Sequence, residues 1–351
     1  MHGIVETIPD LCKRCYSCIR ECPAIAIRVQ NGQAVVITER CISCGHCVTV
    51  CSQNAKATIS DVERVINEIL PQGNVVALIA PSFPASFPDS YDKIPAALKK
   101  IGFDKVCEAA FGADMVSPVY LSEIENGGSK TIISSACPAV YNYVEMYYSK
   151  LIPNLANVVS PMIAMGRYIK ENFGEDKKVV FIGPCIAKKS EYKDDKVEGI
   201  IDAVLTFAEL KEIFDRNNIV YTELEDINFD PPQGLMGKSF PLAGGLIKTA
   251  DIPDDILEKK VIVVEGREKV EEILNEIADG NINAKFIDIL FCEGCIKGPA
   301  IDSDLNYYAR REKVVDYIND RIKAADKQVW KSNLYNSRNV DLKREFTNRN
   351  M

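Results

Sequence analysis

Beyond residue 60, apolar residues recur either at helical spacing or in short unbroken runs. The segments 61–70 (DVERVINEIL) and 268–277 (EKVEEILNEI) place their apolar residues on one helical face, and a Pro-Gln-Gly sequence at 71–73 ends the first helix. Each apolar run is bounded by Gly, Pro or charged residues, which is typical of buried strands in a parallel sheet. The runs are residues 74–82, 131–138, 177–185, 261–266 and 286–292. The pattern predicts an α/β domain with two sheets that face each other across a cleft.

The first sixty residues follow a different pattern. Apolar and polar residues alternate through 24–37 (AIAIRVQNGQAVVI), on both sides of Asn31 and Gly32. Alternation around an Asn-Gly pair predicts a two-stranded hairpin with a tight turn. We therefore expect a small α+β domain over residues 1–60, ahead of the larger α/β domain.

Composition narrows the classes of function. The chain has 351 residues, 47% of them hydrophobic, and a net charge of -8, so it can bury a large core beneath an acidic surface. An acidic surface disfavours nucleic acid and anionic membranes as partners. The start of the chain has no signal-peptide pattern, and no apolar run approaches the roughly 18 residues of a membrane span. We expect a cytoplasmic protein that binds neither nucleic acid nor membrane.

Thirteen Cys residues suggest metal binding, because thiols in the cytoplasm are kept reduced and rarely form disulfides. Eight of them form two C-x2-C-x2-C-x3-C motifs within residues 12–51. In such a pair, three Cys of one motif and the last Cys of the other bind each 4Fe-4S cubane. One cluster is thus assigned to Cys12, Cys15, Cys18 and Cys51, and the other to Cys41, Cys44, Cys47 and Cys22. Zinc sites pair two C-x2-C units over longer gaps, so the spacing favours cubanes.

These motifs and the hairpin resemble bacterial two-cluster ferredoxins. Pro23 follows Cys22 as in that family, whereas Ser52 follows Cys51, a departure that removes no ligand. His46 lies inside the second motif. We expect it to face solvent or a cluster sulfur rather than to bind iron, because its cluster already has four thiolates.

Four further Cys residues follow apolar runs, namely Cys137, Cys185, Cys292 and Cys295. The carboxyl ends of parallel strands meet at one edge of a sheet, so these thiols are expected to converge on one cleft. A single Cys there would more often be structural, but four, three of them beside Pro or Gly, favour a shared metal site. Cys107 fits neither pattern and is expected in the core.

Three segments around these residues, SSACPAV, GPCIAKKSE and FCEGCIKGP, resemble the cluster-binding signatures of iron-only (FeFe) hydrogenases, in the same order. IAPS (79–82) and FPLAGGLIKTA (240–250) resemble two further segments that line the active site in that family. The resemblance implies a ferredoxin-like domain over 1–60 and a two-lobed FeFe-hydrogenase-like domain over 61–325. Residues 326–351 are then expected to be a tail that leads into further domains.

The resemblance also implies the family's H-cluster. This is a 4Fe-4S cubane on Cys137, Cys185, Cys292 and Cys295, joined through Cys295 to a two-iron unit that carries CO and cyanide. Lys188 matches the family's lysine beside one cyanide, and Ser82 with the backbone at Pro81 would contact the other. Glu191 either pairs with Lys188 or Lys189, or belongs with Lys189 to a solvated surface run, 188–196 (KKSEYKDDK).

The chain departs from catalytic relatives where protons are delivered. Their first signature has a proton-donating Cys at the place of Ala136. The relay's next members fall on Ala156 and Tyr120, and only Glu123 keeps a carboxylate. In addition, FCEGC spaces its Cys as C-x2-C instead of C-x3-C, and Gly183 replaces a Met.

These departures fit the sensory branch of the family. We expect a slow hydrogenase of the ferredoxin-hydrogenase type that senses H2 or redox state. Its partners would be H2 and protons, a redox protein such as ferredoxin, and hydrogenase maturation proteins. Two alternatives stay open: an electron-transfer or sensor protein with three cubanes and no two-iron unit, and an iron-sulfur assembly factor of the prelamin-A recognition factor type. The eight-Cys module and Lys188 count against the assembly factor.

Overall fold

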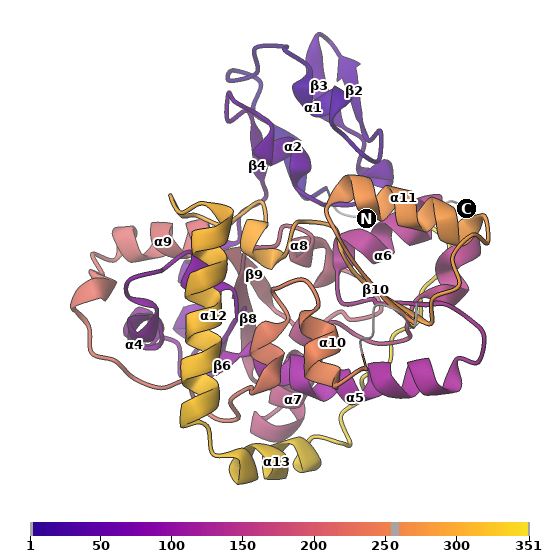
Figure 1. Ribbon diagram of the computed structural model, residues 1–351. Coiled ribbons are helices and arrows are strands. Elements are labelled where there is room, and N and C mark those ends of the chain that lie inside the picture. Colours follow the sequence, from indigo (N-terminus) through magenta and orange to yellow (C-terminus); the bar gives the residue numbers. More distant parts are fainter. Residues whose placement is uncertain (1–2, 254–259, 350–351) are drawn as a thin grey trace.

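The computed structural model describes residues 3–253 and 260–349, which form a small N-terminal module seated on a larger α/β domain (Figure 1). The elements of the module are β1 (Val5–Thr7), α1 (Ser17–Arg20), β2 (Ile27–Gln30), β3 (Gln33–Val36), α2 (His46–Thr49) and β4 (Lys56–Thr58). Strands β1 and β4 pair antiparallel and bring the two ends of the module together. Strands β2 and β3 form the predicted hairpin, in which Asn31 and Gly32 both have positive φ, as the tight turn requires.

Two parallel sheets form the core of the larger domain, which confirms the predicted fold class. The strands are β5 (Val75–Ile79), β6 (Lys105–Glu108), β7 (Ile132–Ile133), β8 (Lys178–Gly183), β9 (Ala203–Thr206), β10 (Val261–Glu265) and β11 (Phe286–Leu290). One sheet has the order β6-β5-β8-β9 and the other the order β10-β11-β7, and every pairing is parallel. The apolar runs did not reveal β6 and β9, whose few apolar residues lead directly into the helices that start at Ala109 and Phe207.

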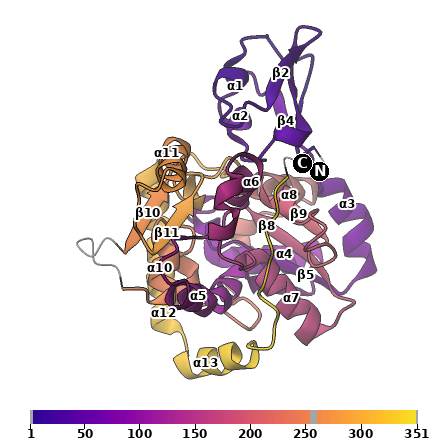
Figure 2. The same ribbon diagram turned by 90° about the vertical axis from the view of Figure 1, so that its right-hand side faces the viewer.

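Helices cover both sheets (Figures 1 and 2). They are α3 (Val62–Arg64), α4 (Ile94–Ile101), α5 (Ala109–Asn126), α6 (Pro138–Tyr147), α7 (Pro161–Phe173), α8 (Lys188–Glu191), α9 (Phe207–Arg216), α10 (Gly245–Ala250), α11 (Arg267–Ala278), α12 (Tyr307–Ala324) and α13 (Lys327–Asn336). Residues 61–70 are helical as predicted, but α3 continues as a π-helical turn, Val65–Ile69. Among the described residues, no helix is long and apolar enough to cross a membrane.

Helices α5 and α7 cross closely beside the first sheet. At the crossing, a Cβ on Gly112 would lie 2.2 Å from the carbonyl oxygen of Pro161, so only glycine fits there. Cys107 on β6 is fully buried in the same core, as expected.

The segment that follows α13, residues 337–349, packs against the larger domain. Figure 2 shows it running from the bottom of that domain to its junction with the N-terminal module. Lys343 forms an antiparallel bridge with Val158, and the side chains of Arg344 and Phe346 are buried. We call residues 337–349 the C-terminal strap.

Candidate functional site

The N-terminal module brings each predicted set of four Cys residues around one small cavity. Cys12, Cys15, Cys18 and Cys51 line the first, which we call site A. Cys22, Cys41, Cys44 and Cys47 line the second, which we call site B. Each site thus takes one Cys from the other motif, as the spacing predicts. In the described part of the chain, no three His, Cys, Asp or Glu side chains could hold a single metal ion, whereas a cubane takes one thiolate per iron.

Backbone N–H groups already point at several of these sulfurs. The N–H of Ala26 donates to Cys22 Sγ at 3.3 Å, and that of Ala55 donates to Cys51 Sγ at 3.3 Å. Such hydrogen bonds stabilise the negative charge that a cluster places on its thiolates. The loops therefore present donors as well as ligands.

The four remaining candidate ligands converge at the carboxyl ends of strands from both sheets. Cys137 precedes α6, Cys185 follows β8, and Cys292 and Cys295 follow β11. Burial raises the pKa of Cys185 to about 11, and the nearby Cys137 thiol adds to the rise. The pKa of Cys292 is raised by burial and then by the three other thiols. Burial therefore disfavours the free thiolate form of these four side chains. Iron binds thiolates strongly and would compensate for that cost.

Site B adjoins this third group, and site A lies farther out. Cys44 and Cys292 line one cavity of about 440 Å³ at the domain junction. Gly45, at a φ of 75°, approaches the larger domain so closely that a Cβ there would lie 2.6 Å from Ile186 Cδ1. At site A, by contrast, Cys15 is exposed. The three sites form a series from the surface to the interior.

We expected His46 to face solvent or a cluster sulfur. Its ring instead lies at this junction and contacts two charged side chains. Its Nε2 is 2.6 Å from Arg267 Nη1 and 3.6 Å from Glu21 Oε2. It therefore links the module to α11.

A further cavity, of about 100 Å³, opens in the larger domain beside Cys137, Cys185 and Cys295. Its walls are mostly small or apolar side chains, among them Ala80, Ala109, Ala113, Ala136, Met162, Phe181 and Phe240. Apart from the three thiols, Ser82 and Lys188 carry the only polar side chains among the described residues that line it. Ser82 Oγ is buried, and no hydrogen-bond partner for it lies among the described residues. Pro81 lines the same wall.

Lys188 reaches this cavity from a buried ion pair. Its Nζ lies 2.6 Å from Glu191 Oε2, which also accepts a hydrogen bond from Ser160 Oγ at 3.0 Å. Lys189 is buried too, and its Nζ donates to Val204 O at 2.8 Å and to Glu209 Oε1 at 3.0 Å. The reading of Glu191 and Lys189 as solvated surface residues is therefore wrong, because both side chains face the interior.

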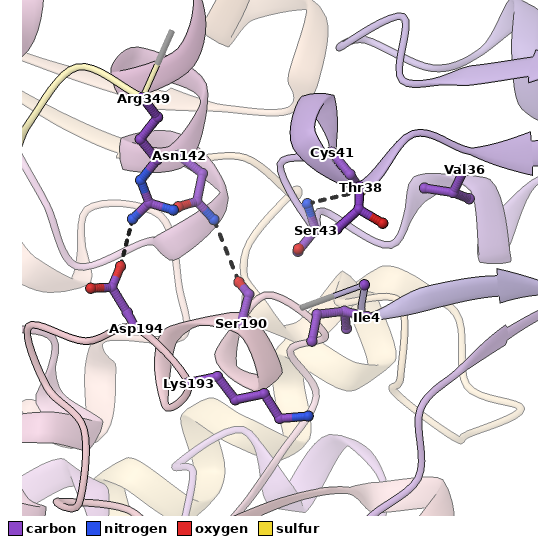
Figure 3. A pocket seen from close by; sticks show the side chains of 11 residues that line it. Ile4, Val36, Thr38, Cys41, Ser43, Asn142, Ser190, Lys193, Asp194 and Arg349 are labelled. Atoms are coloured by element: carbon purple, nitrogen blue, oxygen red, sulfur yellow. Dashed lines mark hydrogen bonds and ion pairs between the residues drawn. The ribbon is translucent and has the colours of Figure 1, made fainter. Parts of the chain in front are cut away.

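The C-terminal strap supplies further charges to this ion pair. Arg344 is buried, with Nη1 3.7 Å from Glu191 Oε1 and Nη2 3.0 Å from Asp194 Oδ2. Arg349 binds Asp194 at 2.6 Å (Figure 3). It also binds Glu145 at 2.6 Å. Sequence reasoning missed Arg344, because nothing in a polar tail marks one arginine as buried.

Ala136 lines the cavity. The other positions of the expected proton relay, Tyr120, Ala156 and Glu123, are not among its lining residues. The Tyr120 hydroxyl is fully buried and lies 3.0 Å from Ser135 Oγ. Burial raises the pKa of Tyr120, so the phenol keeps its proton. Ala156 is buried in the core, and Glu123 is partly exposed.

Gly183 has a steric explanation. A Cβ on Gly183 would lie 2.8 Å from the Phe181 ring and 2.9 Å from Ala80 Cβ. Since Phe181 lines the cavity, this ring occupies space beside position 183 that a longer side chain would need. The cavity is thus shaped by Phe181 at this wall.

The fold and the sites define an iron-sulfur protein with a ferredoxin-like module on an α/β domain, and comparisons with known proteins give its family. Residues 73–299 match the family model "Iron only hydrogenase large subunit, C-terminal domain", and residues 4–52 match a "4Fe-4S dicluster domain". The chain belongs to the iron-only hydrogenase large subunit family.

Individual relatives include both a hydrogenase and a nuclear prelamin A recognition factor. The chain is 30% identical to Iron hydrogenase 1 of Clostridium pasteurianum over 68% of this chain and 52% of that protein. It is 24% identical to Nuclear prelamin A recognition factor of Xenopus laevis, over 60% of this chain and 54% of that protein. The chain thus spans about half the length of these two relatives. Its fold matches that of a variant of FeFe-hydrogenase HydA1 from Chlamydomonas reinhardtii, with a TM-score of 0.67, 17% identity, and coverage of 84% of this chain and 100% of the other.

Iron content tests the three groups of Cys. The protein reconstituted without a two-iron unit should bind about twelve irons, because twelve thiols form three sets of four. Cys292→Ser should remove about four irons and leave the two ferredoxin clusters, whereas the control Cys107→Ala should retain all twelve. About eight irons in fully reconstituted wild type would exclude the third cluster.

The close approach at Gly45 gives a second prediction. Gly45→Val should lower the free energy of unfolding by about 1–3 kcal/mol more than Gly32→Val, because only the first adds a clash with the larger domain. Both glycines have nearly the same φ, 75° and 76°, so the backbone strain is matched. Denaturant unfolding of the reconstituted proteins measures the difference, and equal losses would contradict the tight junction.

Proposed function

We propose that this protein is an FeFe hydrogenase of low activity that carries an H-cluster and senses H2 or redox state. Cys137, Cys185, Cys292 and Cys295 would hold the cubane, and Cys295 would join it to the two-iron unit. The observation that carries the proposal is the cavity beside Cys295, in which Ser82 and Lys188 supply the polar side chains of an otherwise apolar wall.

The residues present fit a compact anionic group with strong hydrogen-bond acceptors. Ser82 Oγ has a proton to donate and lacks a partner among the described residues. Lys188 adds a buried cation, and its bond to Glu191 fixes the direction from which that charge acts. Cyanide ligands are anionic acceptors, so one could accept from Ser82 and the other from Lys188. The apolar walls exclude water around them.

When bound beside Cys295, the two-iron unit would supply the reversible cleavage of H2 into two protons and two electrons. The order of the sites would give electrons a route from site A at the surface, through site B, to the buried cubane, or the reverse. A redox protein such as ferredoxin would exchange electrons at site A, where Cys15 is exposed.

The described residues at the positions of the family's proton relay give protons no comparable route through side chains. Ala136 lines the cavity and has no ionisable group, and Ala156 is likewise inert. The Tyr120 hydroxyl bonds to Ser135 and holds its proton. A positioned proton-transfer group contributes about a hundredfold to ten-thousandfold to a rate, so its loss by itself makes turnover slow. A slow enzyme suits sensing better than bulk H2 metabolism.

We also propose that the chain divides into residues 1–60, 61–325 and 326–351. Hydrogenase maturation proteins would install the two-iron unit. The two alternatives, a three-cubane electron-transfer protein and an assembly factor, share the fold but need no two-iron unit. Spectroscopy of that unit therefore separates them.

Infrared spectra give the direct test. Protein matured together with hydrogenase maturation proteins should show CO and cyanide stretching bands, which neither alternative would give. Cys295→Ser is the control, since loss of the joining thiolate should abolish the bands while sites A and B keep their clusters. Matured wild type with three cubanes and no such bands would refute the proposal.

Turnover tests the missing proton donor. Ala136→Cys should raise H2 oxidation and evolution by about tenfold or more, because it restores a titratable group at the cavity wall. The rise should be incomplete, since Ala156 and Tyr120 still interrupt the route. Ala136→Ser is the matched control of similar size with a weaker acid. Wild type as fast as catalytic hydrogenases would show that another proton route exists.

A further inference from the structure

A buried lysine lies in the N-terminal module where no charged partner meets it. Lys56 on β4 is only 5% exposed. Its Nζ donates hydrogen bonds to Ala34 O at 2.9 Å and to Thr7 Oγ1 at 2.5 Å. Among the described residues, no carboxylate lies within 4.0 Å of this nitrogen. A buried ammonium group without an opposite charge is costly, so its counter-charge must come from elsewhere.

The cluster sites are the candidates for that counter-charge. Lys56 lines the site A cavity together with Cys12, Cys15, Cys18 and Cys51. Its contacts also lead toward site B. Ala34, whose carbonyl oxygen accepts the hydrogen bond from Lys56, belongs to a buried cluster with Cys18 of site A and Cys22 and Cys47 of site B. One buried cation thus lies near thiols of both sets.

We propose that Lys56 is the buried counter-ion of the two ferredoxin clusters and raises their reduction potentials, that of site A more than that of site B. A cubane held by four thiolates is negatively charged, and reduction adds one more negative charge. A nearby cation in a medium of low dielectric constant therefore stabilises the reduced cluster more than the oxidised one. The effect is larger at site A because Lys56 forms part of its wall.

This assignment affects how the protein handles electrons. Site A carries the exposed Cys15 and is the outermost of the three sites. A raised potential there favours uptake of an electron from a donor and holds it at the surface side of the series. The inference depends on the dicluster module alone and is independent of the H-cluster.

Lys56→Met tests the role in the full, reconstituted chain. In a redox titration followed by electron paramagnetic resonance, the site A potential should fall by about 59 mV or more, which is a tenfold change in the ratio of reduced to oxidised cluster. The site B potential should fall less, and the third cubane should not change. Lys13→Met is the matched control: Lys13 lines the same cavity but is exposed, so water screens its charge and the shift should be much smaller.

Lys56→Gln separates charge from hydrogen bonding, since glutamine can still donate to Ala34 O. The proposal requires that Gln lower the potentials nearly as far as Met does. If either variant loses the site A cluster, the fall at site B still decides. Unchanged potentials at both sites, or equal shifts in the Lys13 and Lys56 variants, would overturn the assignment and leave Lys56 a structural residue.

Discussion

The bond between iron and thiolate is the interaction on which this structure depends. Three times the chain gathers four thiols around one point, twice within loops of the small module and once where strand ends of both sheets meet. Burial alone pushes these thiols toward their neutral form, as at Cys185 and Cys292. Bound iron would compensate part of the thiolate charge, so cluster binding should stabilise the fold.

Charge placement follows from these negative centres. Each region that would hold one has a buried cation nearby: Lys56 at the ferredoxin sites and Lys188 at the large-domain cavity. Lys188 is itself held by Glu191, which Arg344 of the C-terminal strap approaches from the other side. The strap therefore belongs to the surroundings of the candidate active site. In the proposed function, electrons would pass along this series of sites, while Ala136 would interrupt the family's side-chain route for protons.

Regular spacing made much of this predictable. The two Cys motifs, the hairpin at Asn31 and the long apolar runs each follow a local rule, and the structure has the corresponding elements. Residues whose role depends on distant partners were not predictable. Glu191 and Lys189 sit in a run that looks solvated, yet Ser160 and Glu209 meet them in the interior. Lys56 and Arg344 show no local pattern, and the apolar residues of β9 continue directly into those of α9, so the strand does not stand out.

The central claim is that the cavity between Ser82, Lys188 and Cys295 holds two irons beyond the twelve of the cubanes. Crystallography of the matured protein at the iron absorption edge tests it most directly. If the two-iron unit is present, two additional anomalous peaks should appear in that cavity, next to the cubane on Cys295, with Ser82 and Lys188 directed at their ligands. A map with three cubanes and no iron in the cavity, from protein matured to completion, would contradict it.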